Sequence, residues 1–283
     1  MAASALAGPS ILGADHLIHR YDGHDRIVEA LECRLVARGF ASEPGPLSAL
    51  HRHLPEGAAE LDDNYLNDVM RSFYRLDDAL LAGYRRLIGT LAGMLGFDFL
   101  FQAVPILRFH PPARFPPSLR TAAGRGSQFH SDILGGHPVR MINAWLALTP
   151  TAGTNALHLA PLADSVAVLE HFAANSCAHD GLAGTLLDFY AAQRDDPAFA
   201  LAVASACTPV PMTPGDLVLF DARCIHGGTE NREATTRVSL DFRLVPLPVD
   251  AAAVEAEIAA AHPRWVRGDI LHERSARELL GAG

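Results

Sequence analysis

The sequence has few cysteines, no excess of basic residues and no long apolar run. Its four cysteines show no CxxC spacing, so the pattern indicates neither a zinc knuckle nor a disulfide framework. Lys and Arg number 23 against 32 Asp and Glu, which gives a formal net charge of −9. Without a dense basic cluster, nucleic acid and anionic membrane surfaces are poor partners. No segment reaches the roughly 18 consecutive apolar residues that a bilayer span requires.

The start of the chain also lacks the basic residues of a signal peptide, and Gly and Pro interrupt its mildly apolar stretch. We therefore expect a cytoplasmic protein that acts on a small molecule and binds neither nucleic acid nor membrane. The oligomeric state is open at this point, with a homodimer as one alternative. At 283 residues, of which 49% are hydrophobic, the chain is long enough for one domain with a sizeable core.

Apolar residues recur at helical spacing in two stretches near the N-terminus. These run from Asp25 to about Arg38 and from Glu60 to about Leu95, with Pro and Gly in the segment between them. One apolar stripe on a helix is the mark of a face that packs on a core. We therefore predict a mainly helical N-terminal part over residues 1–100.

From about residue 101 to 246 the pattern changes to short apolar runs separated by Pro and Gly, which is typical of strands. A stretch of helical texture, from about Ser165 to Ala206, interrupts these runs, and residues 247–283 return to a helical pattern after Val249. This order predicts a single domain over residues 1–283, mainly β with α: a double-stranded β-helix, or jelly roll of cupin-like type, with a helical insertion. The predicted strands lie in FLFQAVPILRFH, SQFHSD, VRMINAWLALT, NALHLAP, PVPMTPGDLVLFDARCIHGG and TTRVSLDFRLVP.

Three residues form a candidate metal site that would also be the catalytic centre. His130 and Asp132 are separated by one residue at the end of a predicted strand, so their side chains point to the same face. His226 follows the apolar run LVLF and is the candidate for the third ligand. Two histidines and one carboxylate leave three positions open on iron(II), as oxygen activation with a bidentate cosubstrate requires. Zinc remains an alternative, although no Glu is placed as a base in an HExxH-like pattern.

A following arginine makes this pattern more specific. Arg237 lies eleven residues after His226, on a predicted return strand that can place it beside the metal. There a planar guanidinium can bind the distal carboxylate of a dicarboxylate in a two-pronged fork, and Ser239 on the same strand face can donate a hydroxyl. Arg243 shares that face and is the alternative, with a buried acid or the substrate as its other possible partners.

Further polar residues near these positions are candidate contacts. Asn143 shares a strand face with Trp145, and a buried Asn needs a hydrogen-bond partner, so we expect it to contact the cosubstrate or a metal ligand. Trp145 is expected in the core. The candidate substrate contacts are Arg108, His110, His137, Arg140 and Arg243.

The quoted motifs resemble a known family. The segments FQAVPILRFHPP, FHSDILGGHPVRMINAWLALTPTAGTNALHLAP and GDLVLFDARCIHGGTENREATTRVSLDFRLVP are similar to iron(II)/2-oxoglutarate dioxygenases of the phytanoyl-CoA dioxygenase-like branch, within it the StrG-like family of streptomycin biosynthesis. The resemblance implies a jelly-roll core, iron on His130, Asp132 and His226, and 2-oxoglutarate on Arg237 and Ser239. Because related halogenases have a small residue at the carboxylate position, Asp132 implies a hydroxylase.

Together the residues and the resemblance predict an Fe(II)/2-oxoglutarate-dependent dioxygenase that uses O2. It would oxidise a C–H bond of a small polar metabolite and release succinate and CO2. The resemblance implies a secondary-metabolite intermediate such as an amino sugar, a cyclitol or an amino acid derivative. Two alternatives stay open from the sequence: a cupin-like metal enzyme that does not use 2-oxoglutarate, and a catalytically silent binding protein of the same fold.

Overall fold

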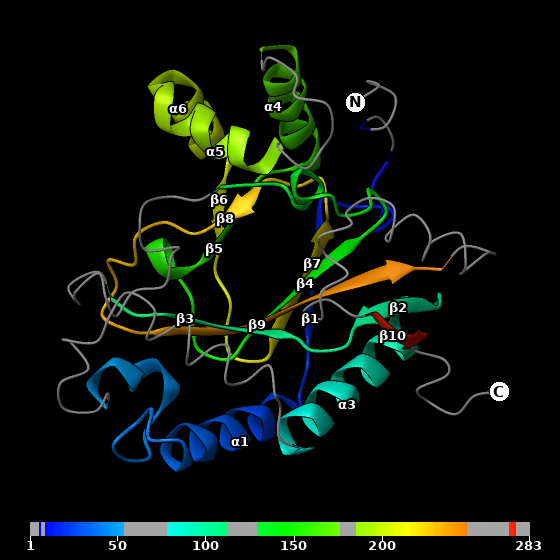
Figure 1. The fold of residues 1–283 in the computed structure, drawn as a ribbon. Coiled ribbons are helices and arrows are strands. Elements are labelled where there is room, and N and C mark those ends of the chain that lie inside the picture. The colour runs from blue at the N-terminus through cyan, green and yellow to red at the C-terminus, as the bar shows by residue number, and fades with distance from the viewer. Residues whose placement is uncertain are drawn as a thin grey trace.

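The computed structural model describes residue 6 and residues 9–53, 78–112, 129–175, 185–247 and 272–275. Its framework is two antiparallel sheets with helices packed around them (Figure 1). The large sheet has the strand order β1-β7-β4-β9-β2-β10, with β3 also paired to β9, and the small sheet has the order β6-β5-β8. The expected mainly β class with helices is therefore confirmed. The strands are β1 His16–Arg20, β2 Phe99–Gln102, β3 Ile106–His110, β4 Ile142–Ala147, β5 Leu157–Leu159, β6 Thr208–Val210, β7 Asp216–Asp221, β8 His226–Gly227, β9 Arg237–Pro246 and β10 His272–Ser275.

Strand β9 shows how the sequence orients the large sheet. Its polar and apolar residues alternate, and a period of two sends them to opposite faces. Helices α1 (His24–Ala37) and α3 (Asp78–Leu95) pack against the apolar face of the sheet and contact each other there (Figure 1). The other face carries the polar residues of β9 and turns toward the small sheet. The apolar face of β9 consists of Val238, Leu240, Phe242 and Leu244.

The two N-terminal helices have the expected apolar stripes. Leu31 of α1 and Leu87 of α3 are completely buried, and burial of each such side chain contributes roughly 1.5–3 kcal/mol. The hydroxyl of Tyr84 donates a 2.6 Å hydrogen bond to the Gln102 carbonyl, which ties α3 to the end of β2. The first part of the helix predicted over residues 60–95 lies outside the described residues.

Three more helices follow β5 in the chain and precede β6: α4 (Leu162–Asn175), α5 (Thr185–Asp195) and α6 (Pro197–Ala206). They lie beyond the small sheet, at the opposite end of the molecule from α1 and α3 (Figure 1). Their contacts centre on edge-to-face rings, with Phe189 at 5.0 Å from Phe172 and 5.5 Å from Phe199. Asp196 caps α6 by accepting hydrogen bonds from two backbone N–H groups. This packing brings α5 close to the metal-site candidates described below.

Two short strands lie in parts of the chain that were expected to be mainly helical. Within the part predicted as mainly helical, His16–Arg20 forms strand β1 at the edge of the large sheet, paired with β7. In the predicted helical tail, His272–Ser275 forms β10 and pairs with β2, while the rest of the tail lies outside the described residues. Both strands are short and polar, and pairing with a distant strand determines their structure more than local pattern does. No helix among the described residues combines the length and apolar character needed to cross a membrane.

A buried ion pair fixes the loop between β7 and β8. Arg223 donates to both carboxylate oxygens of Asp221 at 2.9 and 2.8 Å, and their side chains are only 5% and 3% exposed. The same guanidinium donates to the carbonyls of Leu6 and Pro9 at 3.0 and 3.2 Å. The N-terminal segment is therefore tied to the loop that leads into His226.

Replacing Arg223 with alanine is expected to lower the free energy of unfolding by roughly 3 kcal/mol, because it leaves the Asp221 carboxylate buried without its partner. Urea titration followed by circular dichroism measures this loss. The control is Arg194→Ala, which breaks an ion pair between side chains that are 72% and 64% exposed and is expected to leave the midpoint unchanged. Equal midpoint shifts in the two variants would contradict this assignment.

Candidate metal centre

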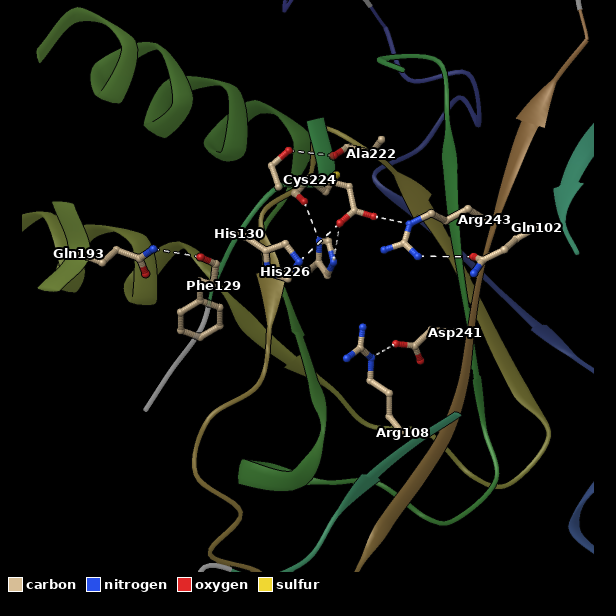
Figure 2. A network of polar contacts seen from close by, with 12 residues as sticks. Gln102, Arg108, Phe129, His130, Gln193, Ala222, Cys224, His226, Asp241 and Arg243 are labelled. Atoms are coloured by element: carbon tan, nitrogen blue, oxygen red, sulfur yellow. Dashed lines mark hydrogen bonds and ion pairs between the residues drawn. The ribbon is translucent and has the colours of Figure 1, made fainter. Parts of the chain in front are cut away.

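His130, Asp132 and His226 come together in space. Oδ1 of Asp132 lies 3.5 Å from Nε2 of His130 and 3.9 Å from Nε2 of His226, and one donor atom from each residue falls within 4.8 Å of the others (Figure 2). Within the described ranges they form the one group of three His, Cys, Asp or Glu side chains able to hold a metal ion. Two donors bonded to one ion at about 2.1 Å are at most about 4.2 Å apart, so both measured separations fit a shared ion.

The local backbone explains how these side chains meet. His130 and His226 form a two-way backbone bridge, with N–O distances of 2.9 and 2.8 Å, and His226 opens β8. Asp132 is not on a strand, as the sequence pattern suggested, but begins a short 3₁₀ helix, η6 (Asp132–Gly135). The Ser131 hydroxyl donates to the Ala222 carbonyl at 2.8 Å and fixes this turn. Gly136 ends η6 with φ 86°, a conformation that favours glycine.

The electrostatics hold Asp132 and His226 in metal-binding forms. Burial alone would raise the pKa of Asp132, but Arg243 and the neighbouring imidazoles hold that pKa well below its usual range. Burial, helped by His130, lowers the pKa of His226 to about 3, so this imidazole is neutral. Its Nδ1 donates to the Cys224 carbonyl at 3.1 Å, which leaves the lone pair on Nε2 facing Asp132. An ionised carboxylate and a neutral imidazole are the forms that bind metals.

Arg243 lies on the other oxygen of the Asp132 carboxylate. Its Nε donates to Oδ2 at 3.0 Å, and its Nη1 lies 3.5 Å from Oε1 of Gln102 (Figure 2). The Arg243 side chain is 12% exposed and the Asp132 side chain is 5% exposed. Of the partners considered for Arg243, the structure therefore shows the buried acid, which is Asp132. Only Oδ1 of Asp132 is directed toward the two imidazoles.

Arg237 is a buried cation in the wall of the same pocket. Its Nη1 donates to the carbonyls of Asn155 and Ala156 at 3.1 and 3.3 Å, and its guanidinium carbon lies 5.7 Å from the centre of the Trp145 ring. Burial lowers the pKa of Arg237 to about 10. Its Nε and the Nδ2 of Asn143 are buried without a hydrogen-bond partner among the described residues. Each such donor costs about 1–3 kcal/mol when it is buried without an acceptor.

The pocket lies between the two sheets and has a volume of about 700 Å³ including its open mouth. It unites the metal-site candidates from η6 and β8 with the polar face of β9. Trp145, expected in the core, packs with the apolar residues between the sheets and also lines the pocket.

Of the other contact residues that the sequence suggested, some line the pocket and others do not. Arg108 lines the pocket and pairs with Asp241 (Figure 2), whereas His110, His137 and Arg140 are described but are not among its lining residues. Ser239 is fully buried and donates to Oδ1 of Asp241 at 3.2 Å. His110 is paired across the sheet with Arg237, and the charge of His137 helps to lower the pKa of Asp132.

The sequence reasoning missed Tyr190 and Asp241. The ring of Tyr190, on α5, lies edge-on to His130 at a centroid distance of 6.1 Å. Burial and the charge of Asp132 raise the pKa of Tyr190 to about 12, so the phenol stays protonated. The helical pattern around Tyr190 did not indicate that this residue lies near the metal site. Asp241 could have been found, because its even spacing from Arg237 on β9 places both on one strand face.

Comparisons with known proteins agree with the motif resemblance. The family model "Phytanoyl-CoA dioxygenase (PhyH)" matches residues 187–239, which include His226 and Arg237. The streptomycin biosynthesis protein StrG of Streptomyces griseus is 26% identical over 177 residues, which is 62% of this chain and 61% of that protein. The chain thus spans about 61% of the length of this relative. Both matches support the resemblance to the phytanoyl-CoA dioxygenase-like branch.

Solved structures resemble the chain over most of its length at low identity. The non-heme monooxygenase ThoJ in complex with Ni has a TM-score of 0.45 and 15% identity, covering 95% of this chain and 91% of that one. The non-heme alpha-ketoglutarate-dependent epimerase SnoN from nogalamycin biosynthesis has a TM-score of 0.42 and 15% identity, covering 92% and 89%. EctD from S. alaskensis with 2-oxoglutarate and 5-hydroxyectoine has a TM-score of 0.40 and 15% identity, covering 86% and 74%.

Proposed function

We propose that the protein is a non-haem iron(II) oxygenase that uses 2-oxoglutarate and O2 to oxidise a C–H bond of a small polar metabolite. One observation carries the proposal: a His-Asp-His group, with Asp132 buried and the imidazoles partly exposed, shares a pocket with a buried arginine that has an orphan donor. His130, Asp132 and His226 would hold the iron, and Arg237 would bind the distal carboxylate of 2-oxoglutarate. When bound, iron(II) and 2-oxoglutarate supply oxygen activation, in which 2-oxoglutarate is converted to succinate and CO2.

The protein supplies geometry for this chemistry. Arg243 occupies Oδ2 of Asp132, so the carboxylate offers Oδ1 as a single ligand atom and leaves positions for other ligands. The Asn155 and Ala156 carbonyls and the ring of Trp145 orient the Arg237 guanidinium, whose Nε–H can donate to a carboxylate. Asn143 offers a second buried donor in the same pocket.

Ser239 has a specific place in this proposal. Its hydroxyl donates to Oδ1 of Asp241, on the strand face that also carries Arg237. A hydroxyl can rotate to a better acceptor, so Ser239 would move its hydrogen bond to the bound carboxylate.

We further infer that the two sheets form a double-stranded β-helix within one domain over residues 1–283, with α4–α6 as an insertion in it. The apolar contacts of Trp145, Val218 and Phe220 with Leu157 and Leu159 join the facing sheets around the pocket, which supports this arrangement. The similarity to StrG supports a role in natural-product biosynthesis, with an amino sugar, a cyclitol or an amino acid derivative as substrate. Asp132 at the ligand position favours hydroxylation.

The two alternative functions leave features of the pocket unexplained. A metal enzyme of the same fold that does not use 2-oxoglutarate has no need of a buried cation with an orphan donor beside the metal. A catalytically silent binding protein has no need of a carboxylate held ionised between two imidazoles.

Oxygen-dependent formation of succinate tests the proposal. The purified protein is loaded anaerobically with iron(II), mixed with 2-oxoglutarate and exposed to air, and succinate is measured with and without a chelator. We expect succinate only with iron, 2-oxoglutarate and O2 together. Oxygen uptake that proceeds without 2-oxoglutarate would favour the first alternative.

A separate prediction concerns Arg243. Replacing it with alanine is expected to weaken metal binding by about 10- to 100-fold, because the Asp132 carboxylate loses the group that orients it. Calorimetric titration with cobalt(II) under nitrogen measures the change. Arg243→Lys should restore part of the affinity because its ammonium can still donate a hydrogen bond to Oδ2 of Asp132. Arg232→Ala, at an arginine side chain 76% exposed, is the matched control. An unchanged cobalt(II) affinity in Arg243→Ala would show that Arg243 does not orient Asp132 for metal binding.

A further inference from the structure

A short turn beside the pocket holds the arginine that the proposed function assigns to the cosubstrate. Turn η7 (Gly153–Asn155) and the residue after it present the carbonyls of Asn155 and Ala156, which accept from Nη1 of Arg237 at 3.1 and 3.3 Å. Arg237 is only 6% exposed, so these two carbonyls determine how its guanidinium is oriented. A contact that fixes η7 therefore also fixes the direction in which Arg237 donates.

The loop between β8 and β9 binds this turn at Thr154. The backbone N–H and the hydroxyl of Thr154 donate to Oε1 of Glu233 at 3.0 and 2.8 Å. These two bonds lower the pKa of the Glu233 carboxyl, so the acceptor is ionised. The same hydroxyl accepts from the backbone N–H of Arg232 at 2.9 Å, and the Thr154 carbonyl accepts from the Thr229 hydroxyl at 3.1 Å. Thr154 thus joins the turn to residues 75–79 positions later in the chain.

The other residues of the turn are fixed as well. Gly153 has a φ of 53°, which favours glycine, and a Cβ atom there would lie 2.6 Å from Oε1 of Glu233. The side-chain amide of Asn155 donates to the Thr235 hydroxyl at 3.2 Å, and its Oδ1 accepts from the backbone N–H of Ala152 at 2.8 Å. Each residue of η7 therefore has a close contact that restricts its movement.

The loop is in turn anchored to the strands around Arg237. The side-chain amide of Asn231, which is 1% exposed, donates to the carbonyls of His110 and Thr235 at 2.8 and 2.9 Å. Its Oδ1 accepts from the backbone N–H of Glu233 at 3.0 Å. His110 ends β3 and is paired with Arg237 of β9. One network of hydrogen bonds therefore connects the Glu233 carboxylate, the turn and the two strands.

We propose that Thr154 and Glu233 are positioning residues that set, through η7 and Arg237, the preference for a keto acid with a distal carboxylate. The inference rests on the proposed function and deepens it, because neither residue is among the described residues that line the pocket. A hydrogen bond from a guanidinium to a carboxylate depends steeply on direction, so a fixed guanidinium favours a carboxylate at one place. A purely structural role of the same contacts would change stability and leave the choice between keto acids unaltered.

Two keto acids of the same chain length measure this preference. 2-Oxoglutarate has the distal carboxylate and 2-oxopentanoate lacks it, while both present a keto acid end to iron. Anaerobic calorimetric titration of the iron(II)-loaded protein gives the dissociation constant of each compound, and the ratio of the two constants is the preference. We expect the wild type to prefer 2-oxoglutarate by about a hundredfold or more, since its distal carboxylate would form a buried charge pair.

Single variants test the two positioning residues. Thr154→Val removes the hydroxyl and keeps the shape of the side chain. We expect it to lower the preference about tenfold by weakening 2-oxoglutarate alone, because that hydroxyl both donates and accepts in its contact with the loop. Thr154→Ser should keep the preference. Glu233→Ala should act like Thr154→Val, and Glu233→Gln, which keeps an acceptor for Thr154, should retain most of the preference. The control is Thr90→Val, at an exposed threonine whose hydroxyl donates to the Arg86 carbonyl within α3.

A double variant shows whether the effect passes through Arg237. If it does, adding Thr154→Val to Arg237→Ala should cause no further change in the preference, since the effects of coupled residues do not add. Cobalt(II) affinity is measured for every variant as the check that the metal site is formed. Glu233→Ala, at a half-buried side chain on a loop, carries the test if Thr154→Val does not fold.

The outcomes separate this inference from the proposed function. The inference is overturned if Thr154→Val and Glu233→Ala keep the wild-type preference or weaken both keto acids equally. It is also overturned if Thr154→Val lowers the preference further in the Arg237→Ala background. In these cases a wild type that prefers 2-oxoglutarate leaves the proposed function intact. A wild type that binds both keto acids equally, or neither of them, would contradict the proposed function and this inference with it.

Discussion

Replacing Asp132 with alanine is expected to eliminate tight iron(II) binding and to reduce 2-oxoglutarate-dependent succinate formation by about a thousandfold or more. A bound metal ion contributes several kcal/mol to such a reaction, and each 1.36 kcal/mol is a tenfold change in rate. The substitution removes the one carboxylate of the candidate site. It also leaves the Arg243 guanidinium, which is 12% exposed, without its partner, so a buried positive charge then lies where a cation would bind.

Iron(II) and cobalt(II) titrations measure the loss of binding, and a succinate assay measures the loss of turnover. Asp195→Ala is the matched control, since it removes a carboxylate whose side chain is 64% exposed. Circular dichroism shows whether Asp132→Ala is folded. A folded Asp132→Ala protein with wild-type metal affinity would show that the metal site lies elsewhere.

The second large effect is expected at Arg237. Replacing it with alanine should raise the dissociation constant for 2-oxoglutarate by about a hundredfold or more, because removing one partner of a buried, hydrogen-bonded charge pair costs about 2–5 kcal/mol. Arg237→Lys should recover little, since a lysine ammonium cannot form the two-pronged fork. Cobalt(II) binding should persist in both variants, which separates this effect from that of Asp132.

Thermal unfolding gives an independent measure of the same contact. The cosubstrate should raise the melting temperature of the cobalt(II)-loaded wild type, because a ligand that binds only the folded state stabilises it. The rise should be absent in Arg237→Ala at the same 2-oxoglutarate concentration. Equal rises in both proteins would mean that the carboxylate is held by other residues.

Most of the large sheet was predictable from local sequence. The apolar runs and the alternation of polar and apolar residues correctly predicted strands at β2, β3, β4, β7 and β9. These strands are long or are buried on an apolar face. The edge strands β1 and β10 were not predicted, since HLIHR and HERS are polar and acquire their structure from pairing with β7 and β2. Such pairings join residues about 200 positions apart for β1, and no local window contains them.

Most residues of the candidate site could be predicted from the sequence, but the contacts between them were less predictable. The spacing of His130 and Asp132 brought them to one site, but through a backbone bridge and a 3₁₀ turn and not through strand alternation. The pairing of Arg243 with Asp132 spans 111 positions and depends on the three-dimensional arrangement of β9 and η6. Tyr190 reaches the site because α4–α6 pack beyond the small sheet, and helical periodicity carries no information about that placement.

Anaerobic addition of 2-oxoglutarate to the iron(II)-loaded protein is the most direct test of the central claim that one pocket holds both. Chelation of iron(II) by a keto acid produces a visible charge-transfer absorption, which can be titrated without turnover. We predict that the wild type develops this absorption with one equivalent of iron, that Asp132→Ala does not develop it, and that Arg237→Ala needs about a hundredfold more 2-oxoglutarate. A wild-type protein that binds iron but never develops the absorption, or an Asp132→Ala protein that retains it, would contradict the account.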